Sequence, residues 1–249
     1  MRRSLLALTA ALALLATTAS GGGLGTMTEA EKAAFREEVR QYLMENPEVL
    51  MEAMQVLQDR QETAALAQDQ AVLAQNHDLI YNDANSWVGG NPDGDITIVE
   101  FMDYRCGYCR KSYGEVANLV KIDGNIRFIV KEFPILGEDS IASSRFAIAM
   151  RQLHGDAAYE LAHDALITLR GSPDTETLRR LAISMGYDAQ PLLDRMATSA
   201  VTDIIAANHR IAGQLNITGT PTFVIGTTLL RGYLPEAEMA AVVAEARGG

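Results

Sequence analysis

Cys106 and Cys109 are the only two cysteines of the chain, and they stand at a Cys-x-x-Cys spacing. Two thiols at that spacing can close into a disulfide and open again, so they favour redox chemistry over a structural scaffold. The thiolate attacks disulfides, and the N–H groups and dipole at a helix N-terminus stabilise it. We predict that Cys106 is the attacking residue. Cys109, one turn further on and more shielded, is expected to resolve the mixed disulfide.

A strand followed directly by a helix is predicted to position these two thiols. The run from Ile96 to Met102 is apolar, rich in β-branched residues and preceded by the turn Asn91-Pro92-Asp93-Gly94, which is typical of a buried strand. After Cys109 the apolar residues recur at helical spacing, at Tyr113, Val116, Leu119 and Val120. Cys106 is therefore expected where the strand hands over to the helix.

Three further features accompany the pair. Glu100 lies six residues before Cys106, Lys131 ends the next predicted strand, and Pro221 stands in the segment Thr218-Gly219-Thr220-Pro221-Thr222-Phe223. In this order they resemble the active site of the thioredoxin superfamily. The resemblance implies that Glu100 is a buried acid that exchanges protons with the cysteines and that Lys131 can pair with it. It also implies that Pro221 follows a cis peptide bond and that the backbone of Thr220 lies beside the sulfurs.

A long helical block, about residues 139–215, separates the two halves of the predicted domain. DsbA-like proteins carry a helical insertion at this place, and this block resembles it. We therefore expect an α/β thioredoxin fold with a helical insertion, a mixed sheet and helices on both faces. This catalytic domain is expected to span residues 88–249.

The first 20 residues have the features of a secretory signal peptide. Arg2 and Arg3 precede the apolar run Leu5–Leu15, and small residues follow at Thr17-Thr18-Ala19. An uncleaved transmembrane anchor is the alternative, but this run of about 11 residues is short for the roughly 20 that a span requires. We predict cleavage near Ala19 and a periplasmic location. The expected partners are exported proteins with cysteines and a membrane protein that resets the redox state.

Residues 28–80 are predicted to form helices in front of the catalytic domain. Thr28 and Glu31 make a capping box, and the segment Tyr42-Leu43-Met44-Glu45-Asn46-Pro47-Glu48 resembles the N-terminal helices of Com-type and suppressor-of-copper-sensitivity C proteins. Two interpretations remain open. The apolar stripe of these helices packs on the catalytic domain, or it pairs with copies of itself and forms a homo-oligomer.

Composition limits the other function classes. The formal net charge of −11 opposes nucleic-acid binding. A structural zinc site needs two ligands besides the cysteines, and His77, His154, His163 and His209 show no ligand spacing. We expect no metal and no cofactor.

The sequence leaves the direction of exchange open. Strong oxidants of the DsbA type carry a histidine between the cysteines, whereas this chain has Gly107 and Tyr108, a pair that resembles the periplasmic isomerases. Arg105 and Arg110 add positive charge nearby and are expected to be solvated. The first hypothesis is a thiol:disulfide oxidoreductase that forms disulfides in exported proteins. The alternatives are a disulfide isomerase or reductase, and a protein that uses the dithiol to bind copper or a client.

Overall fold

A computed structural model of the chain describes residues 27–248, which fall into two compact units divided between Gln61 and Glu62. The predicted signal peptide lies outside the described residues. The first unit holds α1 (Glu29–Glu45) and the beginning of α2 (Glu48–Gln75). Thr28 and Glu31 form the predicted capping box, in which each side chain accepts the other's backbone N–H. Within the described part of the chain, none of the helices combines the length and hydropathy needed to cross a bilayer.

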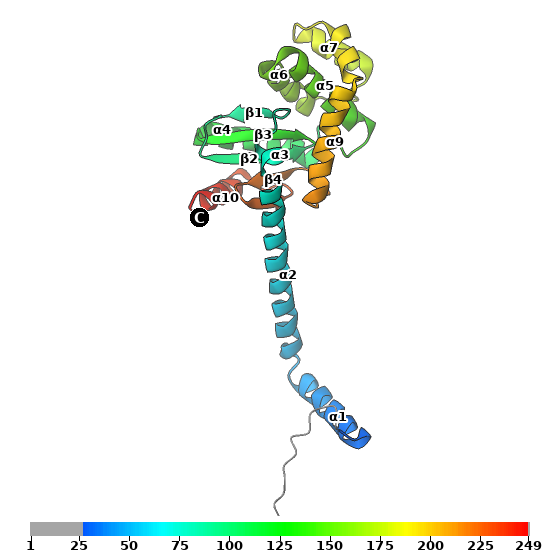
Figure 1. The fold of residues 1–249 in the computed structure, drawn as a ribbon, viewed down its shortest axis with the longest axis vertical. Helices are drawn as coiled ribbons and strands as arrows, with labels where there is room; N and C mark the ends of the chain where they lie inside the picture. Colours follow the sequence, from blue (N-terminus) through cyan, green and yellow to red (C-terminus); the bar gives the residue numbers. More distant parts are fainter. Residues whose placement is uncertain (1–26, 249) are drawn as a thin grey trace, which may run out of the picture. The chain divides into compact units, whose positions relative to one another are not determined.

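The second unit is built on a mixed sheet with the order β1-β3-β2-β4-β5 (Figure 1). The central strands β2 and β3 run parallel, and the other three pairings are antiparallel. This arrangement confirms the predicted α/β class. The strands are β1 (Trp87–Gly90), β2 (Ile96–Met102), β3 (Ile126–Glu132), β4 (Thr222–Ile225) and β5 (Thr228–Arg231).

Helices cover both faces of this sheet. Side chains alternate between the faces along each strand, so a strand that is apolar throughout presents apolar side chains to both. Ile98 of β2 packs with α4 and α10, whereas its neighbours Val99 and Phe101 pack with the end of α2, with α3 and with α9. The helices of this unit after α2 are α3 (His77–Tyr81), α4 (Gly107–Asp123), α5 (Glu138–His154), α6 (Asp156–Thr168), α7 (Thr175–Ser184), α8 (Ala189–Met196), α9 (Ser199–Gln214) and α10 (Glu236–Gly248).

The five helices α5 to α9 form the insertion between β3 and β4. They share one apolar core that includes Phe146, Leu166 and Leu192, and both cysteines belong to the same cluster. The predicted helical insertion is thus present, and it contributes directly to the surroundings of the thiols.

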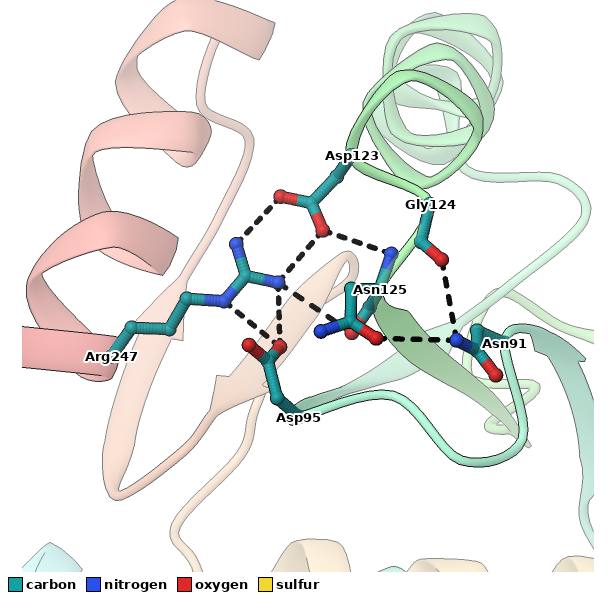
Figure 2. A network of polar contacts seen from close by, with 6 residues as sticks. All are labelled: Asn91, Asp95, Asp123, Gly124, Asn125 and Arg247. Carbon is teal, nitrogen blue, oxygen red and sulfur yellow. Dashed lines mark hydrogen bonds and ion pairs between the residues drawn. The ribbon is translucent and has the colours of Figure 1, made fainter.

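Arg247 near the end of α10 joins this helix to the segment before β2 and to the end of α4 (Figure 2). Its guanidinium donates to Asp95 Oδ1, at 2.7 and 2.9 Å, and to both carboxylate oxygens of Asp123, at 2.6 and 2.7 Å. Asp95 precedes β2, and Asp123 ends α4. The hydrogen bonds that Arg247 donates to Asp123 lower the pKa of the Asp123 carboxyl, and the same bonds raise the pKa of Arg247.

We predict that Arg247→Ala lowers the stability of the catalytic unit. The two carboxylates lose the cation that they share. The free energy of unfolding should therefore fall by an amount at or above the upper end for a surface ion pair, about 1 kcal/mol. Thermal unfolding followed by circular dichroism should show a midpoint lower by about 2–4 °C. Arg179→Ala is the matched control, because the one ion pair of Arg179 among the described residues is with Glu176 on its own helix, and its hydrogen bonds to Gln190 are long, at 3.5 Å. Equal midpoints for both variants would contradict the prediction.

Candidate redox active site

Cys106 is the N-cap residue of α4, where the chain leaves β2 and enters the helix. Both cysteines are free thiols, and Cys106 is 8% exposed whereas Cys109 is 1% exposed. The structure therefore has the geometry that the spacing predicts, with one thiol at the helix N-terminus and the other shielded one turn in. Burial, and next the charge of Glu100, raise the pKa of the Cys109 thiol.

The connection from β2 to α4 is fastened by Asp103, a residue that the sequence analysis missed. Its buried carboxylate accepts N–H bonds from Arg105 at 2.8 Å, Ile135 at 2.8 Å and Leu136 at 3.1 Å. These bonds tie the turn before Cys106 to the loop that follows β3. An aspartate that bonds the backbone two residues on is a turn signal in the sequence, but its second partner segment lies about 30 residues away.

The peptide bond between Thr220 and Pro221 is cis, as predicted. The Cys106 thiol donates to the carbonyl oxygen of Thr220 over 3.1 Å. The loop reaches the thiol because β4, which begins at Thr222, pairs antiparallel with β2 and places Thr222 opposite Phe101. The N–H of Gly232 donates to Pro221 O at 3.0 Å and holds the loop from its other side.

Glu100 is buried at the centre of β2, with 6% of its surface exposed, but the predicted pairing with Lys131 is wrong. Lys131 stands opposite Phe101 in the parallel register and therefore faces the other side of the sheet. Its Nζ donates to Leu79 O and to Asp83 Oδ2, both at 2.8 Å.

The charged residue on the Glu100 side of the sheet is a second carboxylate, Glu132. It stands opposite Met102 and accepts hydrogen bonds from Tyr104 Oη at 2.8 Å and Tyr159 Oη at 2.5 Å. Burial, with the charge of Glu132 as the next cause, raises the pKa of Glu100 to about 8, and burial raises the pKa of Glu132 to about 7. Two carboxyl groups with pKa values of about 8 and about 7 thus lie on this face of the sheet, where the sequence predicts one.

A small cavity of about 70 Å³ opens beside Glu100. His163 is buried at this cavity, and burial lowers its pKa to about 4, so it is neutral at pH 7. The exposed residues Glu160 and Asp164 of α6 also line the cavity. The carboxyl of Glu100 therefore shares a cavity with two exposed carboxylates.

Side chains flanking the cysteines complete the site. Arg105 and Arg110 are not simply solvated as expected, because Arg105 donates to Gly171 O at 2.8 Å and Arg110 to Tyr104 O at 2.7 Å. Tyr108 is 64% exposed. Among residues 27–248, no group of three or more His, Cys, Asp or Glu side chains is arranged to hold a metal ion.

Comparisons with known proteins agree with this geometry. Residues 97–243 match the family described as the DSBA-like thioredoxin domain, and residues 31–64 match the one described as copper resistance protein ScsC N-terminal domain. A thioredoxin-like oxidoreductase from Silicibacter pomeroyi DSS-3 is 39% identical, with a TM-score of 0.66 over 70% of this chain and 99% of that one.

Two further solved structures are similar. A linker-deletion mutant of ScsC from Proteus mirabilis is 26% identical, with a TM-score of 0.68 over 91% of this chain and 99% of that one. The thiol-disulfide exchange protein alpha-DsbA2 from Wolbachia pipientis is 25% identical, with a TM-score of 0.67 over 73% of this chain and 97% of that one.

Curated relatives are longer proteins. The Na(+)/H(+) antiporter NhaA of Herminiimonas arsenicoxydans is 24% identical over 163 residues, which make up 65% of this chain and 26% of the antiporter. The chain thus spans about a quarter of the length of that relative.

We predict that Glu100→Gln stabilises the reduced protein increasingly as the pH rises. The folded-state pKa of about 8 lies above the ordinary value of 4.5, so the contribution of Glu100 to stability is complete below about pH 4.5 and is lost as the pH rises through 8. Glutamine does not ionise, so the variant escapes this loss. Because each pKa unit is worth 1.36 kcal/mol and about three units separate pH 5 from the pKa, the gain at pH 9 relative to pH 5 should be on the order of 4 kcal/mol.

Urea unfolding at pH 5, 7 and 9 measures this effect. Glu176→Gln is the control, since Glu176 lies largely exposed on α7 and should give the same difference at every pH. If the difference in unfolding free energy between Glu100→Gln and the parent protein stays constant from pH 5 to 9, ionisation of Glu100 does not destabilise the protein.

Proposed function

This chain belongs to the DSBA-like thioredoxin domain family, and from that premise we propose that it catalyses thiol–disulfide exchange through Cys106 and Cys109. The preferred direction is disulfide formation in exported proteins. The observation that carries the proposal is the Cys106 thiol at the N-terminus of α4, 3.1 Å from the carbonyl of Thr220 at the cis peptide bond. Thr220 and Pro221 thus offer a client backbone a pairing site beside the reacting sulfur.

The exchange proceeds in two displacements. A client thiolate attacks Cys106 Sγ of the oxidised protein, the Cys106–Cys109 bond breaks, and its electron pair goes to Cys109. A second client thiolate then attacks the client sulfur of the mixed disulfide, and Cys106 leaves as a thiolate at the helix N-terminus. Two client thiols are oxidised and the two protein cysteines are reduced, so a membrane redox partner must take two electrons to complete the cycle.

Glu100 is proposed as the proton donor to Cys109. The raised pKa of the buried Cys109 thiol means that this sulfur takes up a proton when it leaves, and Glu100 still holds one near neutral pH. The cavity lined by Glu160 and Asp164 lets Glu100 regain its proton from the surface. When the disulfide forms again, Cys109 returns its proton to Glu100.

Isomerase or reductase activity is the second candidate, and it is favoured by Tyr108. No histidine lies between the cysteines to stabilise the Cys106 thiolate further, which argues against the most oxidising behaviour. Refolding of scrambled ribonuclease without added oxidant separates the two, because only an isomerase restores activity there.

We predict that Cys109→Ser traps a mixed disulfide with a client, because Cys106 still attacks and no resolving thiol remains. Incubation of this reduced variant with an oxidised, unfolded disulfide protein should give a covalent complex on non-reducing gels, and dithiothreitol should release it. Cys106→Ser is the matched control and should give no complex. Trapping by Cys106→Ser in place of Cys109→Ser would reverse the two assigned roles.

We also propose that the protein acts outside the cytoplasm, in the periplasm. The support is the arginine-led apolar run that begins the chain and ends in small residues, together with a redox pair suited to an oxidising compartment.

We propose that the protein self-associates through the N-terminal helices of residues 28–80. No residue of α1 is buried, and several large apolar side chains of this unit are about half exposed or more, namely Phe35, Tyr42, Met44, Leu50, Met51, Met54 and Leu57. Apolar surface of this extent on two helices is typical of an interaction face.

We predict that the double variant Leu50→Glu, Leu57→Glu is monomeric whereas the parent chain is an oligomer. The two leucines lie seven residues apart on one face of α2 and are each over half exposed, so two charges there would oppose apolar pairing. Multi-angle light scattering of the full-length mature proteins measures the mass. Glu52→Ala, on a different face of the same helix, should leave the oligomer intact. A monomeric parent chain would refute self-association.

A further inference from the structure

Tyr108 is an aromatic side chain held in the open beside the attacking sulfur. It follows Cys106 by two residues in the first turn of α4 and is 64% exposed. A Cβ added at Gly107 would meet nothing within 4 Å, so the surface over the start of the helix is clear. A client polypeptide that brings its cysteine to Cys106 must therefore pass next to this ring.

Tyr108 is paired with a second ring from a distant part of the chain. The ring of Tyr233, in the connection between β5 and α10, is stacked with it at a centroid distance of 6.4 Å and an interplanar angle of 24°. We call these two residues the aromatic platform. Its two rings come from opposite ends of the catalytic unit's sequence, so the platform exists only in the folded state.

Glu115 and Lys111 hold Tyr233 in place. Its hydroxyl donates to the Glu115 carboxylate, at 2.8 and 3.0 Å, and the N–H of Glu236 donates to the same carboxylate at 2.9 Å. Lys111 Nζ lies 4.2 Å from the centre of the Tyr233 ring. Lys111 and Glu115 both come from α4, the helix that carries Tyr108, so the ring of Tyr233 is fixed relative to Cys106.

The platform is continuous with the loop that faces Cys106. Gly232, which precedes Tyr233, donates its N–H to Pro221 O at 3.0 Å. A groove of about 150 Å³ lies here, lined by residues 218–222 with Arg231 and Gly232. The sulfur, the Thr220 carbonyl, the groove and the platform thus form one surface.

We propose that the aromatic platform selects clients by binding an aromatic side chain next to the client's cysteine. This inference rests on the proposed function and names its substrate class. Flat rings favour an aromatic partner by stacking or edge-to-face contact. Lys111 Nζ already occupies the cation position over the Tyr233 ring, so this ring is not free to bind a client lysine or arginine in the same way.

The experiment compares reduced peptides that carry one cysteine flanked on both sides by Phe, Ser or Lys. Stopped-flow measurement of their reaction with the oxidised full-length protein gives a rate constant for each. We expect the Phe-flanked peptide to react about tenfold faster than the Ser-flanked one, and the Lys-flanked peptide to show no such gain over the Ser-flanked one. Tyr108→Ser and Tyr233→Leu should each reduce the Phe-to-Ser ratio to below about threefold.

Two controls locate the effect. Tyr233→Phe keeps the ring without the bonds to Glu115 and should retain most of the selectivity. Ile122→Ala, an exposed apolar residue at the far end of α4, should retain all of it. Equal rates for the Phe and Ser peptides with the parent protein, or a ratio unchanged in Tyr108→Ser and Tyr233→Leu, would overturn the proposal.

Reaction with reduced glutathione, measured on the same preparations, separates this inference from the proposed function. A parent protein that exchanges with glutathione but does not discriminate among the peptides refutes only the platform. A parent protein that exchanges with neither refutes thiol–disulfide chemistry itself.

Discussion

The pairing of β2 with two neighbours at once is the constraint on which the site depends. Its parallel partner β3 brings the loop that binds Asp103, and its antiparallel partner β4 brings the loop that ends at Pro221. Since β2 ends at Met102 and a three-residue turn leads from there to Cys106, both loops arrive at the sulfur. A strand buried on both faces has one register that satisfies its apolar side chains, so the position of the thiol relative to Thr220 follows from packing as well as from hydrogen bonding.

Two buried carboxylates on one face of this sheet are a cost to the folded state. Burial is the main cause of the raised pKa of both, and two tyrosine hydroxyls compensate Glu132 in part through its Oε1. A group with a pKa near 8 is poorly suited to stabilising the protein and well suited to exchanging protons with a thiol at neutral pH. The stability of the core and the proposed chemistry therefore oppose each other at Glu100.

The surface around Cys106 contains both backbone and side-chain groups that a client could contact. Under the proposed function, Thr220 offers a backbone pairing site that does not depend on the client's side chains. Tyr108 and Tyr233 add a contact that depends on the client's side chain. The N-terminal unit presents apolar surface of a different kind, on helices with few buried residues. Its family match, at residues 31–64, is separate from that of the catalytic unit.

The sequence by itself determined the features that are local in the chain. Strand, Cys-x-x-Cys and helix follow one another without interruption, and the cis bond before Pro221 is carried by a short segment, so pattern and spacing sufficed for them. The α/β class and the helical insertion were also predictable, because apolar periodicity distinguishes five successive helices from the strands on either side. The short strand β1 was missed, since two of its four residues are glycines and its pairing with β3 is what makes it a strand.

Only the tertiary structure decided what lies across the sheet from what. Lys131 and Glu132 are neighbours in the chain, and the period of two in a strand places one on each face. The predicted partner of Glu100 was therefore wrong by one residue, and a carboxylate stands where a cation was expected. Asp103 and Tyr233 act through contacts with distant segments, at Ile135 and Glu115, for which no periodicity within the sequence gives a signal. The partners of such residues are determined by strand register and loop position, and both are fixed only when the strands pair.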